Sequence, residues 1–245
     1  MRVFVGYDSR EDIAYKVCKY SILKHSPYSV VIPVIQDELR AKNIYNRDPD
    51  LLSSTAFSVT RFLTPYLASY YELAVFCDCD FLFTRDIDTI IDELSYKDFE
   101  DKALWVVQHE YTPKGKSKMD QQKQIAYPRK NWCSFMLFDC HDNLTKKLTP
   151  ELINKVDIPY LNELKWAEDK IGKLNPKWNF LVGEYEAPDL GAEVLKESTP
   201  NTPFGLHYTR GGVWLGNDYC PSYDYAELWL QYKAEYEQSL KVQKK

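Results

Sequence analysis

The sequence contains no long hydrophobic run and little that would mark an exported protein. No apolar stretch in the 245 residues approaches the roughly 20 residues that a membrane-spanning helix needs. The first residues, MRVFVGYD, meet charged residues at once, so we expect no signal peptide. The 6 cysteines are too few and too scattered for a disulfide scaffold. We therefore expect Cys77 and Cys79 to be packed thiols and the compartment to be reducing and cytoplasmic.

An excess of positive charge is also absent. The chain has 31 Lys and Arg against 36 Asp and Glu, a net charge of -5, which argues against a domain built to bind nucleic acid. With 44% hydrophobic and 27% charged residues, it is neither disordered nor a bundle of membrane helices. No repeat or linker divides the chain, so we predict a single domain over residues 1–245.

The order of apolar patterns predicts an α/β fold. Residues 2–6 form a β-rich run, residues 11–24 carry apolar side chains at helical spacing, and residues 30–35 read as a second strand. Strand, helix and strand in this order indicate a parallel crossover. The pattern further predicts an irregular segment at 37–54, a helix at 55–67, a buried strand at 73–77, a helix at 87–94, strands at 104–107 and 135–138, short helices within 143–170 and a last helix at about 223–240.

Two aspartates follow the buried strand at 73–77 directly. Open α/β sheets bind ligands beyond the carboxyl ends of their strands, and Asp78 and Asp80 stand at such an end. Paired carboxylates suit Mn²⁺ or Mg²⁺ held together with a substrate diphosphate. The alternative is a pair of turn aspartates. The apolar residues on both sides favour the metal, because buried acids are costly unless they are paired or metal-bound.

Six short segments stand in an order that is typical of one enzyme family. They are Gly6-Tyr7-Asp8, Ser58–Phe62 with Pro65-Tyr66-Leu67, Phe76–Asp80, Asn131–Phe138, Trp178-Asn179 and His207–Trp214. Together they resemble the GT-A-fold glycosyltransferases of family 8, which includes glycogenin and lipopolysaccharide galactosyltransferases. The resemblance covers roughly residues 2–216, and a compact bacterial and phage-like subgroup looks closest. It implies a single GT-A domain with a mostly parallel sheet and helices on both faces. Residues 1–110 would hold nucleotide and metal, and residues 111–245 would shape the acceptor side.

The resemblance implies a metal site and a nucleotide pocket. Asp78 and Asp80 match the D-x-D motif, and His207 matches the third protein ligand of the metal. For a lone histidine, the alternative is an ordinary core or surface residue. Tyr7 would stack on uracil, and Asp8 would accept a hydrogen bond from the base or ribose. A helix cap is the alternative role for Asp8.

Further matches concern the sugar. Arg61 would contact the sugar or phosphate of the donor, with a structural ion pair as the alternative. Asp169 would accept hydrogen bonds from sugar hydroxyls near the reacting carbon, although Lys170 follows where the family has glutamine; a solvated helix carboxylate is the alternative. The sugar pocket would be lined by Asn131, Trp132 and Ser134, and Trp132 is equally consistent with a core aromatic.

The chain departs from the family at the late lysine that reaches the diphosphate. It has Gly212-Val213-Trp214 in place of Lys-Pro-Trp. Arg210, or Lys123, Arg129 or Lys130 from a long loop, would replace that cation, and Gly211 and Gly212 would let the backbone approach the diphosphate. The loop at 111–130 is rich in cations and lacks apolar periodicity. We predict that it is a lid over the diphosphate, with a flexible insertion as the alternative.

Taken together, the residues and the resemblance predict a hexosyltransferase. A hexose would move from a UDP-sugar to an acceptor hydroxyl with retention, with Mn²⁺ or Mg²⁺ as cofactor. The acceptor class stays open among glycan, lipid, protein side chain and modified nucleobase, and the oligomeric state is not readable. Two alternatives remain: a nucleotidyltransferase, although YDSRED stands where a Gly-rich basic loop would be expected, and a non-catalytic carbohydrate-binding module with aromatic platforms.

Overall fold

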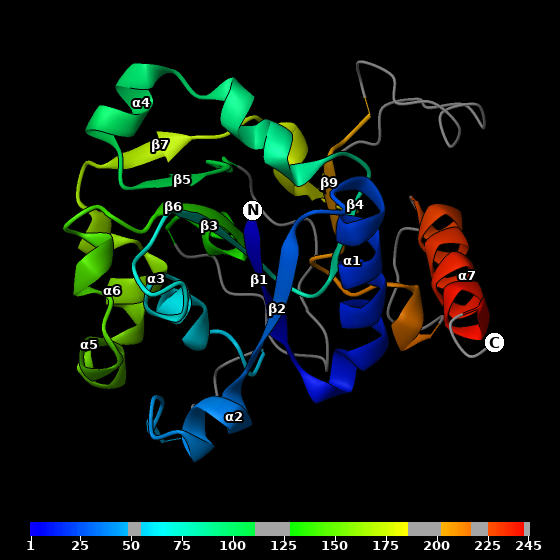
Figure 1. Cartoon of the computed structure of the whole chain (residues 1–245), viewed down its shortest axis with the longest axis horizontal. Coiled ribbons are helices and arrows are strands. Elements are labelled where there is room, and N and C mark those ends of the chain that lie inside the picture. Colours follow the sequence, from blue (N-terminus) through cyan, green and yellow to red (C-terminus); the bar gives the residue numbers. More distant parts are fainter. Residues whose placement is uncertain (49–54, 111–127, 186–201, 217–224, 243–245) are drawn as a thin grey trace.

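A six-stranded sheet forms the centre of the molecule (Figure 1). The computed structural model describes residues 1–48, 55–110, 128–185, 202–216 and 225–242. The strand order is β2-β1-β3-β6-β5-β7. The strands are β1 (Arg2–Tyr7), β2 (Val30–Ile35), β3 (Leu73–Cys77), β5 (Leu104–Val106), β6 (Phe135–Asp139) and β7 (Ile171–Lys173).

All strands of this sheet but one point in the same direction. β1 pairs parallel with β2 and β3, and β5 pairs parallel with β7. β6 lies between β3 and β5 and runs antiparallel to both. Residues 74–77 of β3 are fully buried, as their continuous apolar sequence predicts for a central strand covered on both faces. The predicted α/β fold with a mostly parallel sheet is confirmed.

Helices lie on both sides of the strands (Figure 1). The crossover helix α1 (Asp12–His25) and the last helix α7 (Ala226–Val242) pack together on one side, where Lys24 Nζ lies 2.6 Å from Glu235 Oε2. On the other side are α3 (Thr64–Leu67), α5 (Pro150–Lys155) and α6 (Ile158–Asn162). Two short helices, α2 (Gln36–Ala41) and α4 (Tyr96–Asp101), complete the α-helices of the described residues. Among these helices, none has the length and apolar character that crossing a membrane requires.

A second, three-stranded sheet stands beside the first. Its order is β4-β9-β8, with β4 (Phe81–Phe83), β8 (Phe180–Leu181) and β9 (Gly205–His207). β4 pairs antiparallel with β9, and Phe81 lies opposite His207. Because β4 begins directly after Asp80, this pairing brings a late segment of the chain to the D-x-D turn.

Two sequence predictions about helices are wrong in detail. Residues 36–41 form α2 inside a segment that was expected to be largely irregular. The helix expected at 55–67 is broken into turns, a 3₁₀ helix and the short α3, in which Pro65 occupies the first turn, where its missing N–H costs nothing. Within the described residues, the 3₁₀ helices span Ser9–Glu11, Thr60–Leu63, Ile87–Glu93, Trp132–Ser134, Thr145–Lys147, Lys165–Ala167, Pro176–Asn179 and Val213–Leu215.

Candidate metal and sugar-donor site

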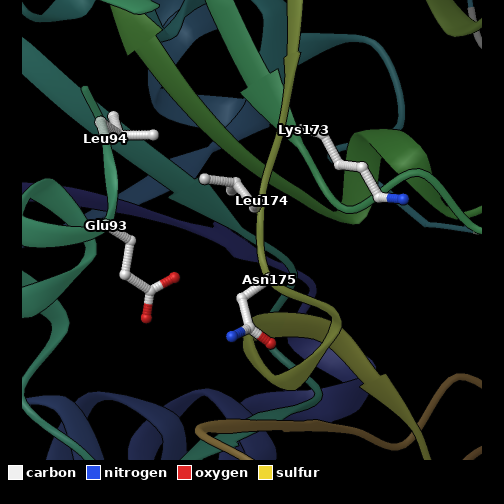
Figure 2. Close-up of a pocket in the computed structure, with 5 residues that line it drawn as sticks. All are labelled: Glu93, Leu94, Lys173, Leu174 and Asn175. Atoms are coloured by element: carbon white, nitrogen blue, oxygen red, sulfur yellow. The ribbon is translucent and has the colours of Figure 1, made fainter. Parts of the chain in front are cut away.

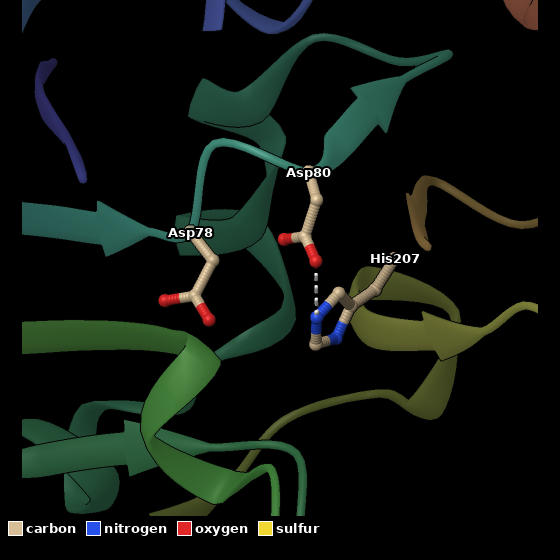
Figure 3. Close-up of side chains that lie close together, drawn as sticks. All are labelled: Asp78, Asp80 and His207. Carbon is tan, nitrogen blue, oxygen red and sulfur yellow. Dashed lines mark ion pairs between the residues drawn. The ribbon is translucent and has the colours of Figure 1, made fainter. Parts of the chain in front are cut away.

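The three residues predicted to hold a metal converge on one point (Figure 3). Asp78 and Asp80 lie in the turn between β3 and β4, and His207 ends β9. One ligand atom from each lies within 4.8 Å of the others. His207 Nε2 is 3.4 Å from Asp80 Oδ2. The imidazole stacks on the Phe81 ring at 4.5 Å between centroids, so the strand pairing that aligns the two residues also orients the ligand.

Buried polar groups behind His207 select its tautomer. Asn179, which is fully buried, donates through Nδ2 to Ser134 Oγ at 2.9 Å and to the Asn131 carbonyl at 3.2 Å. Its Oδ1 therefore faces the imidazole and accepts from His207 Nδ1 at 2.9 Å. With the proton on Nδ1, Nε2 keeps a lone pair directed toward the aspartates, as a metal ligand requires.

Arg61 holds the first aspartate. Its Nη1 lies 3.0 Å from Asp78 Oδ1 and also donates to the Cys133 carbonyl at 2.8 Å. The guanidinium stacks on Phe57 and Phe76, each ring centroid 5.3 Å away. Arg61 therefore makes an ion pair, but its partner is a candidate metal ligand and not a purely structural carboxylate.

Glu11 is a site residue that the sequence did not reveal. Its side chain is among the buried groups, with 3% of the residue exposed. Glu11 Oε1 accepts from Trp214 Nε1 at 3.2 Å, and Oε2 accepts from Cys79 Sγ at 3.7 Å. Burial, and then the charge of Asp80, raise the pKa of Glu11 to about 8. An acidic residue at the start of a helix is so ordinary that its position carried no signal.

His109 is a second residue near the site that the sequence analysis did not identify. It follows β5 and is buried, and its Nδ1 lies 2.6 Å from the Tyr185 hydroxyl. Burial, together with the charge of His207, lowers the pKa of His109 to about 3. Its backbone carbonyl accepts a hydrogen bond from Trp132 Nε1 at 3.1 Å. This bond holds Trp132 next to the segment that follows β5. A signal was available, because His109 stands two residues beyond a predicted strand of a mostly parallel sheet.

Tyr7 and Asp8 lie at the end of β1 but are engaged within the chain. The Tyr7 hydroxyl donates to Asp12 Oδ1 at 3.1 Å, and burial together with Asp12 raises its pKa. Asp8 caps the 3₁₀ helix and accepts from Arg10 and from the Ala56 N–H. Burial alone would raise the pKa of Asp8, but these hydrogen bonds hold it below its ordinary value. The cap given as the alternative role for Asp8 is therefore present.

The glycine pair begins a loop that leads from β9 to Trp214. Gly211 has φ 94°, a left-handed conformation that favours glycine. A Cβ on Gly212 would lie 1.9 Å from the Trp214 ring, so only glycine lets the indole fold back over the backbone. Arg210 Nη1 donates weakly to the Gly183 carbonyl at 3.4 Å, and its Nε lies 3.8 Å from Glu184 Oε1.

The structure describes only some of the other residues that could replace the missing lysine. Arg129 Nη1 donates to the Glu163 carbonyl at 2.6 Å, and its guanidinium lies over the Trp132 ring. Lys130 is buried. Lys123 and most of the predicted lid, with Lys114, Lys116 and Lys118, lie outside the described residues, so the lid stays a prediction.

The structure does not bring Asp169 to this site. Asp169 is exposed and lies before β7. The carbonyl of Lys170, the residue that precedes β7, accepts from Ala103 N at 3.0 Å, just before β5 begins. Because β5 and β7 are parallel to β3, Asp169 lies at the amino ends of the strands, whereas Asp78 lies beyond a carboxyl end. By the strand register Asp169 is level with Glu72, six residues before Asp78, and at about 3.3 Å per residue that is roughly 20 Å along the strands. In the structure Asp169 is thus exposed and away from the candidate metal ligands, a position that fits the solvated carboxylate given as its alternative role.

A separate cavity of about 360 Å³ opens near the carboxyl end of β7 (Figure 2). Glu93 Oε2, at its wall, accepts from Trp178 Nε1 at 3.2 Å. None of the residues predicted to form the site lines this cavity. Its lining consists of Glu93, Leu94, Lys173, Leu174 and Asn175.

Several solved glycosyltransferases resemble this chain in structure. The bifunctional glycosyltransferase WbbM superposes with a TM-score of 0.62 at 13% identity over 100% of this chain and 51% of that chain. GlyE of Streptococcus pneumoniae TIGR4 gives 0.57 at 16% identity over 95% and 59%, so the chain spans little more than half of either protein. The galactosyltransferase LgtC, solved with donor and acceptor sugar analogues, gives 0.54 at 13% identity over 96% of both chains. The chain therefore has the GT-A fold.

A closer relative defines the family. Protein CDI of Arabidopsis thaliana is 44% identical over 237 residues, which cover 96% of this chain and 86% of that protein. The chain belongs to the same family as Protein CDI. No protein-family model matches the sequence.

Proposed function

We propose that the protein is a metal-dependent glycosyltransferase that moves a hexose from a UDP-sugar to an acceptor hydroxyl with retention, as the resemblance to family 8 implies. One observation carries the proposal. Two carboxylates and one oriented imidazole, drawn from distant parts of the chain, meet within 4.8 Å beyond the carboxyl end of β3. This is the edge at which open α/β sheets bind their ligands.

The donor set fits a divalent metal. Carboxylate oxygens and a neutral imidazole nitrogen are ligands that suit Mn²⁺, and the carboxylates also suit Mg²⁺. Asp78, Asp80 and His207 would hold the ion. When bound, it would supply positive charge to the diphosphate leaving group. Arg61 fixes Asp78 by the ion pair at 3.0 Å, so this ligand needs little rearrangement to bind.

The remaining residues have supporting or binding roles. Asn131, Ser134 and Asn179 orient His207 through their hydrogen bonds. The Gly211-Gly212 backbone would approach the diphosphate, and Tyr7 would face the nucleotide base. We name no general base, because the leaving phosphate can take the proton of the acceptor hydroxyl.

The acceptor side and the compartment belong to the same proposal. Residues 111–245 would shape the acceptor side, and the acceptor would be a glycan, a lipid, a protein side chain or a modified nucleobase. The cysteines in the described residues are free and buried, which supports the expected reducing, cytoplasmic environment.

Calorimetric titration of UDP tests the proposal directly. UDP should bind with Mn²⁺ present and weakly in chelator, because two carboxylates and a diphosphate repel one another without a cation. A screen of UDP- and GDP-sugars for metal-dependent hydrolysis would then identify the donor. The exposed Glu151→Gln serves as a control that should behave as wild type. Equal UDP affinity with Mn²⁺ and with chelator would refute the proposed function.

A further inference from the structure

The carboxyl group of Glu11 connects the two segments that carry the candidate metal ligands. Through Oε1 it accepts a hydrogen bond from Trp214 Nε1. Trp214 lies in the loop that follows β9, the strand that ends at His207. Through Oε2 it accepts from Cys79, which stands between Asp78 and Asp80. One side chain on the turn after β1 thus contacts both halves of the metal site without being a ligand.

Besides this hydrogen bond, Trp214 packs against other aromatic rings and its own loop. Its ring folds over Gly212, meets the Tyr208 ring edge-on at 5.7 Å and lies 5.1 Å from the Trp229 ring. At the other end of the loop, Tyr208 N donates to the Asp80 carbonyl at 3.0 Å. The path of the glycine pair is therefore fixed near Asp80 at one end and at Glu11 at the other.

The burial of Glu11 indicates that its hydrogen bonds help to stabilise this part of the fold. A carboxyl group with little access to water, close to the carboxylates of Asp8 and Asp80, costs free energy that an apolar residue would avoid. The two hydrogen bonds from separate segments offset part of that cost. They also fix the distance between the turn with the aspartates and the loop with the glycines.

We propose that Glu11 is a positioning residue, which holds the Gly211–Trp214 loop against the Asp78–Asp80 turn so that the glycine backbone and the metal ligands engage one diphosphate together. The inference rests on the proposed function, because it assumes that a nucleotide diphosphate and a divalent metal bind here. It assigns Glu11 to the binding of the donor and to no chemical step.

The test is calorimetric titration of UDP in excess Mn²⁺. Glu11→Leu and Trp214→Phe each remove the indole hydrogen bond and should raise Kd about threefold to tenfold. Glu11→Gln should stay within about twofold of wild type, because an amide oxygen still accepts from the indole. The double variant Glu11→Leu/Trp214→Phe should bind about as well as either single variant, because both remove the same contact. Glu151→Gln is the matched surface control.

The outcomes separate the inference from the proposed function. If wild-type protein fails to bind UDP with Mn²⁺, the proposed function itself fails. If wild type binds but the folded Leu and Phe variants bind equally well, only the role of Glu11 is refuted. Losses that add in full in the double variant would refute it too. Thermal denaturation identifies any variant that does not fold. If Glu11→Leu does not fold, the UDP affinities of Trp214→Phe and Glu11→Gln still test the role of Glu11.

Discussion

Asn179 should control the metal affinity of a site to which it contributes no ligand. In Asn179→Ala, His207 Nδ1 loses its acceptor at 2.9 Å, and Ser134 Oγ and the Asn131 carbonyl lose a common donor. Loss of a hydrogen bond that orients a histidine ligand typically costs about 10-fold to 100-fold in metal affinity. At about 0.5–1.5 kcal/mol for each of the three hydrogen bonds, the free energy of unfolding should also fall by roughly 2–4 kcal/mol.

Two measurements check this prediction. Mn²⁺ titration in the presence of UDP gives the metal affinity, and ¹⁵N chemical shifts of the His207 ring report whether Nδ1 carries the proton. In wild type Nε2 should be the unprotonated nitrogen, and in Asn179→Ala the tautomers should mix. The exposed Asn143→Ala controls for loss of an asparagine. A folded Asn179→Ala protein with unchanged Mn²⁺ affinity would refute the reasoning.

Three further predictions concern charge. Asp80→Ala should abolish the Mn²⁺ dependence of UDP binding, yet in chelator its thermal midpoint should stay level or rise. The reason is that the substitution relieves a repulsion of up to about 3–4 kcal/mol between the carboxylates of Asp80 and Asp78. A marked fall of the thermal midpoint in chelator would contradict this. Arg61→Ala should lower the free energy of unfolding by up to about 3–5 kcal/mol, because the half-buried carboxylate of Asp78 loses its guanidinium partner. Adding Asp78→Ala should recover part of the loss in urea denaturation. Burial lowers the pKa of His109 from its ordinary value near 6.5 to about 3 in the folded protein. The contribution of the neutral imidazole to the free energy of unfolding is therefore fully present above about pH 6.5 and is lost as the pH falls toward 3. His109→Gln should therefore flatten the pH dependence of stability in that range, and an unchanged slope would show that burial does not shift the pKa of His109.

Much of the sheet could be predicted because its strands are continuous apolar runs. β1, β2, β3 and β6 lie where their patterns place them, within a residue or two. The reversed direction of β6 could not be read, because a buried strand has the same composition in either orientation. The helix predicted at 55–67 failed for another reason. Its apolar side chains face the core, but its backbone alternates turns and 3₁₀ helix, and spacing alone does not separate these from an α-helix.

At the site, the residues with a strong local pattern were found, and those defined by contacts were missed. Asp78, Asp80 and His207 stand in short recognisable segments, and they converge. Glu11 has ordinary neighbours in sequence, and His109 has only its place just beyond a predicted strand. Their contacts with Trp214 and Tyr185 appear only in the structure. Asp169 matches the family pattern only in part, and the structure places it before β7, at the amino ends of the strands.

The reversal of β6 bears on how such a protein could change its substrates. β5 ends at the edge of the sheet where Asp78 stands, and β6 begins at that same edge, with Ser134 beside His207. The connection between them, which includes the long cationic segment, therefore leaves and re-enters the sheet on the side of the metal ligands. Because both ends of this connection lie at that edge, an insertion or deletion within it need not shift the register of β5 against β6. Changes of length in this connection are thus compatible with a fixed framework for Asp78, Asp80 and His207.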